Sequence, residues 1–463
     1  MSGIGKIFPK IIVFGLPRLI KKSFSLPNIF KKNNMKKLIF LPIAACLVAQ
    51  PVLAQQDNAE APKFTYKMSG FVDPQFWMDT REVVSAREEQ MLFYPAPKKL
   101  DADGNDINAQ PSNNALAITA RIGMKINAPD ALNAKISGYL EGDFTGATND
   151  GINMLRLRHA YINMRWEKSN LLLGQYWHPM VAHEVMPGTR PLNMGIPFHP
   201  YSRYVQARYT QYFGGLELSG IAAFQLDNKS VGPNGGSTAY LRNSCVPELN
   251  AQLCYRTDNL LLGAMFNYVL LQPRTSVDVK FYGPDGTTVE STKTYKTDTK
   301  IGSTAVSVFG KLNVSELSFR FQGIYGDNLV EQGLMGGYIE SALGDDNKYS
   351  YSNFGTTTFW VDLGRSKGVC RPGLFAGYGR NNSFGDDIDK NANVFGRGID
   401  IEYVWRVQPR VGFYPTDYLN FFGEVEYTNA AYGKRVDNEG KYHYESDYNV
   451  GNYRFIVAAV LNF

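Results

Sequence analysis

The chain ends in the stretch NYRFIVAAVLNF, residues 452–463, whose side chains alternate in character. One face is almost wholly apolar and consists of Tyr453, Phe455, Val457, Ala459, Leu461 and Phe463. The residues between them form the other face, which also carries Arg454 and two asparagines. A period of two predicts a β-strand. A soluble sheet normally hides its apolar face and ends in a polar tail, so this strand raises the question of what covers it.

The same period of two recurs in many other segments. In NALAITARIGMKIN, residues 114–127, every second side chain from Leu116 to Ile126 lies on an apolar face, and Arg121 and Lys125 lie on the opposite one. Similar alternation marks residues 134–144, 215–227, 316–326, 398–408 and 420–428. Segments of about 10–14 residues with this pattern cross a bilayer once when tilted. Strands of a soluble β-sandwich or propeller, the alternative fold, average only about five or six residues.

The connections between these segments alternate in length. Short turns such as EKSN (167–170) and FGG (213–215) interleave with long polar stretches at 81–113, 179–202, 228–246, 273–300, 327–354, 382–396 and 429–448. This asymmetry is typical of an outer-membrane barrel. The predicted strands begin near Tyr66, Asn114, Ala134, Asn153, Leu171, Arg203, Leu216, Pro247, Leu260, Ile301, Glu316, Gly355, Arg371, Arg397, Tyr418 and Val450.

The predicted fold class is therefore all-β: a transmembrane antiparallel β-barrel of about 16 strands. It covers residues 66–463 and follows a short segment at 55–65. Because a barrel has no edge, its last strand pairs with its first, and the apolar face of the last strand meets lipid.

Residues 1–54 form a basic leader with nine Lys and Arg and no Asp or Glu. From Met35 the leader has the charged, apolar and small-residue regions of a signal peptide, and we expect cleavage after Ala54. Residues 1–34 then either result from a start codon that was assigned too early, which we prefer, or form a real extension. Residues 43–46 resemble a lipidation motif, which is the alternative processing site. These features predict export to a bacterial outer membrane.

Removing the nine leader cations changes the formal charge from +5 to −4, so nucleic acid is not the expected partner. Cys245, Cys254 and Cys370 follow the leader, and an odd number argues against a disulfide framework. The histidines lack the close Cys or carboxylate companions of a zinc site. We expect no metal and no cofactor.

Five stretches resemble the DcaP-like outer-membrane porin family, which is related in pattern to phosphate-selective porins. They are LRLRHAYINM (155–164), LLLGQYWHPM (171–180), MGGYIESALG (335–344), GLFAGYGRNN (373–382) and EVEYTNAAYG (424–433). The resemblance implies a homotrimeric 16-stranded outer-membrane channel for small, often anionic, solutes. The ending also resembles the C-terminal signal that the barrel-assembly machinery reads, with Phe463, Leu461 and Phe455 as its apolar positions.

One of the long stretches, residues 179–202, is rich in proline and unusually apolar for a loop. Proline stiffens a segment without needing ladder hydrogen bonds. The resemblance places this segment after the fifth strand and folds it into the lumen as a constriction, with His183, Glu184 and Arg190 as its polar candidates. The alternative is an exposed loop that packs on itself.

Charged rings on the pore wall set the selectivity of such channels. The candidates for this wall are Arg121, Arg156, Arg158, Arg208, Arg320, Glu141 and Asp143. Arg156 and Arg158 share a face that continues into apolar residues, so either a bulge intervenes or they lie near the rim. Histidines near the constriction offer a possible pH response.

We expect a porin for passive diffusion of small hydrophilic solutes that favours small anions such as carboxylates. A non-selective general porin is the main alternative, and an outer-membrane adhesin is a weaker one. No GxSxG, HExxH or GxxxxGK[ST] motif is present, so we do not expect an enzyme.

Overall fold

The computed structural model describes residues 63–146, 149–190, 194–341, 343–344, 346–382, 392–433, 435–436, 442–443 and 445–463. The predicted leader, its cleavage after Ala54 and residues 55–62 lie outside this part of the chain. The described strands close into a 16-strand antiparallel barrel, as the alternating pattern predicts.

Two of the barrel strands are each interrupted and have two parts: β1 (Thr65–Val72) with β2 (Gln75–Asp79), and β5 (Ser112–Leu116) with β6 (Arg121–Asn127). The others are β7 (Lys135–Asp143), β8 (Arg156–Arg165), β9 (Ser169–Trp177), β10 (Arg203–Phe213), β11 (Leu216–Phe224), β14 (Glu248–Arg256), β15 (Leu260–Leu271), β18 (Ile301–Val314), β19 (Leu317–Asp327), β21 (Tyr351–Arg365), β22 (Cys370–Asn381), β24 (Ile401–Phe413), β25 (Leu419–Tyr432) and β28 (Tyr448–Asn462). Each predicted strand start lies in or close to one of these strands. The long connection at 144–155 was not predicted.

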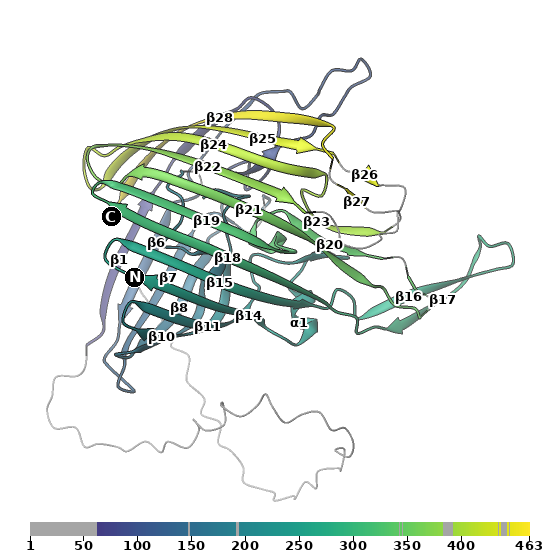
Figure 1. Ribbon diagram of the computed structural model, residues 1–463, viewed down its shortest axis with the longest axis horizontal. Coiled ribbons are helices and arrows are strands. Elements are labelled where there is room, and N and C mark those ends of the chain that lie inside the picture. Colours follow the sequence, from purple (N-terminus) through teal and green to yellow (C-terminus); the bar gives the residue numbers. More distant parts are fainter. Residues whose placement is uncertain are drawn as a thin grey trace, which may run out of the picture. The chain divides into compact units, whose positions relative to one another are not determined.

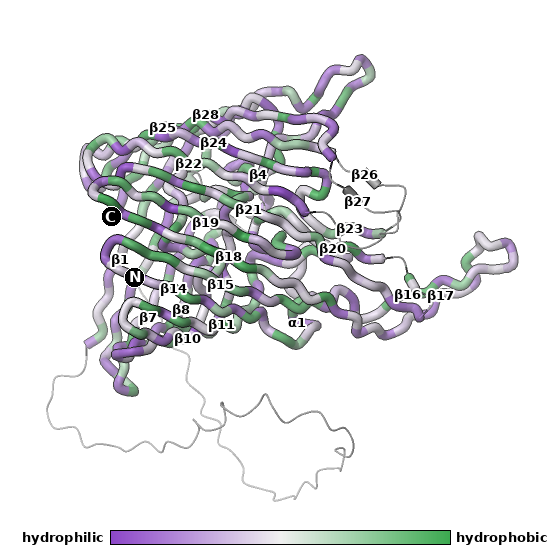
Figure 2. The backbone as a smooth tube through the Cα atoms, in the orientation of Figure 1, coloured by the Kyte–Doolittle hydropathy of each residue, from purple (hydrophilic) through white to green (hydrophobic). Residues whose placement is uncertain are grey.

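The terminal stretch belongs to β28, which closes the barrel against β1 and β2 (Figure 1). Val457 and Phe463 are 57% and 61% exposed, whereas Ile456 and Val460 are buried. Figure 2 shows that apolar segments recur along the strands of the wall. An apolar outer face beside a partly polar inner face is the pattern of a strand between lipid and lumen, which answers the question that the ending raises.

Short turns join the strands at one end of the barrel and long connections at the other (Figure 1). The long connections carry small elements: β3 (Val83–Ala86), β4 (Met91–Pro95), η2 (Pro179–Val181), β12 (Val231–Gly232), β13 (Gly235–Gly236), α1 (Ala239–Ser244), β16 (Ser276–Tyr282), β17 (Val289–Lys296), η3 (Val330–Gln332), β20 (Gly336–Glu340), β23 (Asn393–Arg397), β26 (Arg435–Val436) and β27 (Tyr442–His443). None of the described helices is long and apolar enough to cross a membrane. Cys245, Cys254 and Cys370 are free thiols.

The main apolar core lies inside the barrel, because three long connections fold inward. They are the described parts of the connections at 80–111, 178–202 and 328–350, and each contributes side chains with little or no exposure, such as Leu92, Val185 and Met335. Val185, Phe198 and Met335 pack in one cluster with wall residues such as Trp360 and Phe375. The inward fold of the connection at 178–202, hereafter the lumen loop, is thus confirmed. The insertion of the other two connections was not predicted.

Candidate functional site

A β-bulge turns the arginines of β8 toward the lumen. The pairing of β7 with β8 shifts between Glu141 and Gly142, so that Glu141 faces His159, Gly142 faces Leu157, and Arg158 is the extra residue. An extra residue reverses the alternation on one side of the bulge. Leu157 is therefore 50% exposed on the outer face while Arg158 is fully buried, and the bulge resolves the direction that the sequence left open.

Gln175 on β9 supports this bulge from the outer side. Its side-chain Nε2 donates to the backbone oxygens of Leu157 and Arg158, both at 3.0 Å. A bulge leaves backbone groups without ladder partners, and an unpaired polar group facing lipid is costly. The buried amide of Gln175 satisfies these two carbonyls.

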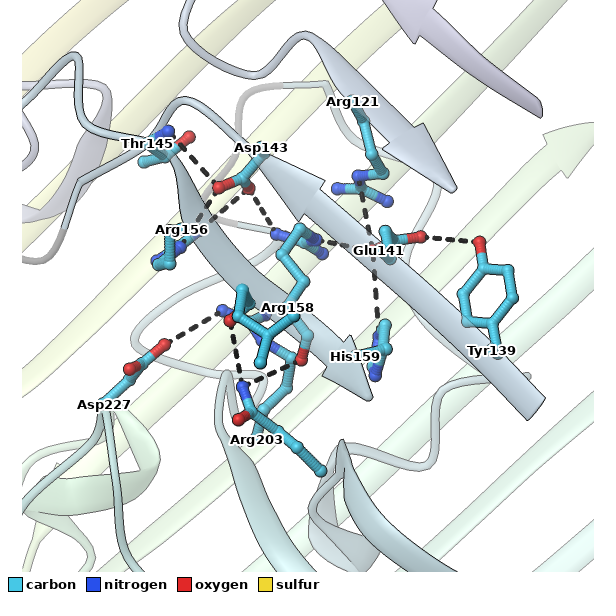
Figure 3. Close-up of polar contacts among 12 residues, drawn as sticks. Arg121, Tyr139, Glu141, Asp143, Thr145, Arg156, Arg158, His159, Arg203 and Asp227 are labelled. Atoms are coloured by element: carbon cyan, nitrogen blue, oxygen red, sulfur yellow. Dashed lines mark hydrogen bonds and ion pairs between the residues drawn. The ribbon is translucent and has the colours of Figure 1, made fainter. Parts of the chain in front are cut away.

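The inward arginines of β8 form an ion-pair network with β7 (Figure 3). Arg158 binds Glu141 and Asp143, each at 2.7 Å, and donates to the Tyr201 hydroxyl of the lumen loop at 3.2 Å. Arg156 makes a two-pronged contact with Asp143 at 2.9 and 3.1 Å. Arg121 is farther from its partner, with Nε 3.6 Å from Glu141. Their carboxylate partners largely cancel the charges of these arginines.

Arg203, at the start of β10, borders the same network and was not singled out from the sequence. It is fully buried, lies 4.0 Å from Asp227, and stacks over the rings of Trp177 and Tyr201. The alternation of side chains predicts which face of a strand a residue lies on, but it does not predict contacts with loops. Arg203 was missed because its partners lie where loops cover the ends of the strands.

The first half of the lumen loop is held against the wall by charge. Glu184 binds Arg256 of β14 through two contacts of 2.6 and 3.1 Å, and Arg256 also binds Glu217 of β11 at 3.0 Å. His183 shares a hydrogen bond of 2.9 Å with the Tyr176 hydroxyl. These contacts attach the beginning of the loop to β9, β11 and β14.

The second half of the loop contacts other strands. Arg320 of β19 donates to the backbone oxygen of Met186 at 3.1 Å. Arg190 donates its backbone N–H to Glu424 of β25 at 2.7 Å and lies 3.8 Å over the ring of Phe422. Because its partners lie on strands from β9 round to β25, the loop crosses the lumen.

Two cavities adjoin the lumen loop at the short-turn end of the barrel. The larger, of about 550 Å³, is lined by residues of β6–β11, β14, β15 and β18 together with Glu184 and neighbouring loop residues. Its charged lining consists of Lys125, Arg165, Arg208, Arg256, Glu184 and Glu217. The smaller, of about 220 Å³, lies among β19, β21, β22, β24 and Gly188 of the loop.

Comparison with known proteins agrees with this architecture. Residues 99–238 match the model of the family described as DcaP outer membrane protein. Over these residues the chain is similar to DcaP outer membrane proteins. The crystal structure of the outer-membrane channel DcaP of Acinetobacter baumannii is 18% identical, with a TM-score of 0.59 over 86% of this chain and 97% of that one. Outer-membrane expressed OmpT of Vibrio cholerae is 9% identical, with a TM-score of 0.50 over 88% and 99%. No curated protein matches the chain.

Arg208 has only neutral hydrogen-bond partners, in contrast to the arginines of the network between β7 and β8. It donates to the side-chain oxygen of Gln206 at 3.2 Å and to the backbone oxygen of Trp177 at 3.3 Å, which are both neutral. Arg406 and Arg454, by contrast, bind Glu426 at 3.0 Å and Asp79 at 2.6 Å. Arg208 therefore presents its charge to the larger cavity without a neutralising carboxylate in contact.

Two histidines of the lumen loop, His183 and His199, are neutral near pH 7. Burial lowers the pKa of His183 to about 4, although Glu184 acts in the opposite direction. Burial likewise lowers the pKa of His199 to about 3. These values do not favour a pH response of His183 or His199 near neutrality. Among the described residues, no three His, Cys, Asp or Glu side chains are grouped as metal ligands.

Proposed function

We propose that the DcaP-like barrel allows passive diffusion of small hydrophilic solutes and favours small anions such as carboxylates. The observation that supports this most directly is the position of Arg208. It lines the larger cavity with neutral partners only in hydrogen-bond contact, while both carboxylates of that cavity, Glu184 and Glu217, bind Arg256.

The charge balance of the larger cavity points the same way. Four cationic side chains and two carboxylates line it. Arg165 adds to the positive potential, and it lies 3.7 Å over the ring of Tyr212. A charge in a low-dielectric passage acts more strongly than one on a solvated rim, where salt screens it. The lining therefore outweighs the net charge of −4 that we expect for the chain without its leader.

The site of selectivity proposed here is centred on Arg208, whereas the sequence-based hypothesis also included Arg121, Arg156 and Arg158. Arg158 and Arg156 are buried in ion pairs with β7, and Arg121 shares Glu141 with Arg158. These three arginines shape the wall, whereas Arg208 supplies the unbalanced charge. The general, non-selective porin remains the alternative that experiment must separate from this one.

We also infer that the barrel forms a homotrimer, as its resemblance to porins implies. On β6–β9 the exposed large apolar side chains are Ile122, Leu140, Leu157, Ile162 and Leu173, all aliphatic. Aromatic residues recur on the outer face of the following strands, such as Tyr209, Tyr255 and Phe266. Because aromatic belts mark lipid interfaces, the aliphatic sector is the natural contact between copies.

Reversal potentials across a KCl gradient in planar bilayers test the function. We expect anion preference in the wild type, and Arg208→Gln should reduce the permeability ratio by a factor of roughly 2–5. Arg380→Gln is the matched control, because it removes the same charge from an exposed residue that pairs with Glu402. Arg208→Lys should retain the preference. Cation preference in the wild type, or equal effects of Arg208→Gln and Arg380→Gln, would contradict the proposal, and a barrel without conductance would favour the adhesin.

A further inference from the structure

The smaller cavity, of about 220 Å³, is lined by an excess of guanidinium groups. Its charged residues are Arg320, Arg365, Arg371, Arg410 and Asp362. Its other lining includes Ser318 and Gly188. Four arginines and one aspartate give a strongly positive lining within a small volume.

The single carboxylate of the cavity is shared between two arginines. Arg410 binds Asp362 at 2.7 and 3.0 Å, and Arg320 lies 3.7 Å from the same side chain. Arg365 pairs with Glu316 at 2.6 Å near the mouth. Arg371 donates to a backbone oxygen and lies 3.7 Å over the ring of Tyr414. Internal ion pairs therefore leave part of the positive charge of the lining unbalanced.

Two buried donors in the cavity have no partner in the described structure. The hydroxyl of Ser318, on a residue 3% exposed, makes no hydrogen bond, and neither does Nε of Arg320. Buried polar groups are nearly always paired, because leaving one unpaired costs about 1–3 kcal/mol. Unpaired donors beside an excess of arginine call for an acceptor that carries negative charge.

The lumen loop is shaped to leave space at this point. A Cβ on Gly188 would lie 2.6 Å from Nη2 of Arg410 and 3.3 Å from Nη1 of Arg320. A Cβ on Gly364 of β21 would lie 3.0 Å from the same Nη2. Glycine at these two positions allows backbone to approach the guanidinium groups closely.

We propose that this cavity is a binding site for one small oxyanion. Arginine's planar fork matches the oxygens of carboxylate and phosphate groups, and the cavity is smaller than the roughly 300–1,000 Å³ of typical organic-ligand pockets. The site deepens the proposed function, since it rests on the entry of anions into the barrel, but it is separate from the larger cavity that contains Arg208.

Inorganic phosphate is the probe, and its ³¹P line width is measured while it is titrated with detergent-solubilised protein. We expect saturable broadening in the wild type. Arg371→Gln and Arg320→Gln should each weaken the binding at least about fivefold, the effect of losing one charge-assisted contact. Arg380→Gln is the matched control, because it removes the same charge from an exposed arginine that lines neither cavity. A heat-modifiable band on unboiled gels verifies that each variant is folded.

Absence of saturable broadening in the wild type, or equal losses in Arg371→Gln and Arg380→Gln, would overturn the site. The result is independent of the reversal potentials. Anion preference without saturable phosphate binding would leave the proposed function standing and remove the site. Phosphate binding that depends on Arg371 in a barrel that prefers cations would leave the site standing and remove the proposed function.

Discussion

Gly70 and Phe463 are joined by two backbone hydrogen bonds, of 2.9 Å from the Gly70 N–H and 3.0 Å from the Phe463 N–H. The last residue of the chain is thereby fixed to the first strand, and the ring of Phe463 lies beside Gly70 on the outer face. A Cβ on Gly70 would lie 2.6 Å from that ring and 2.3 Å from the backbone oxygen of Arg121. The closure of the barrel therefore depends on a glycine at position 70.

Gly70→Val should destabilise the barrel by about 1–3 kcal/mol, as expected when atoms are forced into filled space. The matched control is Gly220→Val, since a Cβ on Gly220 meets nothing within 4 Å. Heat modifiability on gels, followed as a function of temperature, measures the difference. Equal behaviour of the two variants would show that the contact between Gly70 and Phe463 does not limit stability.

Gln175→Leu should destabilise the barrel by about 1–3 kcal/mol, because it removes the amide that satisfies two carbonyls of the bulge. Gln211→Leu is the control, since Gln211 donates to a backbone oxygen in an exposed contact at a turn. Guanidinium unfolding followed by tryptophan fluorescence compares the two variants. An unchanged midpoint for Gln175→Leu would mean that the bulge needs no support from the outer face.

The period of two was sufficient to predict the strands, because each strand lies between lipid and lumen and must alternate. The bulge at Arg158 could not be predicted in the same way. One inserted residue changes the face without changing the composition, so LRLRHAYINM permitted both directions. Ion-pair partners were equally hidden, since they depend on the register between strands. The alternation of side chains placed Arg208 on the lumen side of the wall, but it could not show that the hydrogen-bond partners of Arg208 are neutral.

The inward folding of residues 80–111 and 328–350 could have been predicted. Both contain short apolar runs, MLFYP at 91–95 and LMGGYI at 334–339, in otherwise polar stretches. The resemblance to porins, and not composition alone, identified the lumen loop. Arg371 and Arg410 were missed for a different reason: they face a cavity that exists only because the lumen loop crosses to that side.

The connection at 328–350 should respond to pH through Glu331. Burial, followed by the nearby Glu248, raises the pKa of Glu331 from 4.5 to about 8. The folded loop therefore holds a proton that the unfolded chain releases above about pH 4.5, so its stability falls as the pH rises from about 5 to 8 and then levels off. Gln332, next to Glu331, accepts a hydrogen bond of 2.8 Å from the N–H of Tyr201, which links this response to the lumen loop.

Hydrogen exchange of residues 328–340 at pH 5 and pH 8, corrected for intrinsic rates, measures this response. Protection should be greater at pH 5 in the wild type and independent of pH in Glu331→Gln. His183→Gln is the control, because His183 is already neutral over this range. Protection that increases toward pH 8 in the wild type would contradict the assignment.

Arg256→Gln should change selectivity more than Arg208→Gln, although each removes one positive charge. Arg256 binds Glu184 and Glu217 at once, so its loss leaves two carboxylates without a counter-ion in the larger cavity and detaches the lumen loop from β14. The permeability ratio should therefore shift toward cations. The double variant Arg256→Gln/Glu184→Gln should recover part of the anion preference, because one unpaired carboxylate is removed. Reversal potentials in the KCl gradient provide the measurement, and equal shifts for Arg256→Gln and Arg208→Gln would show that these carboxylates lie away from the path of the ions.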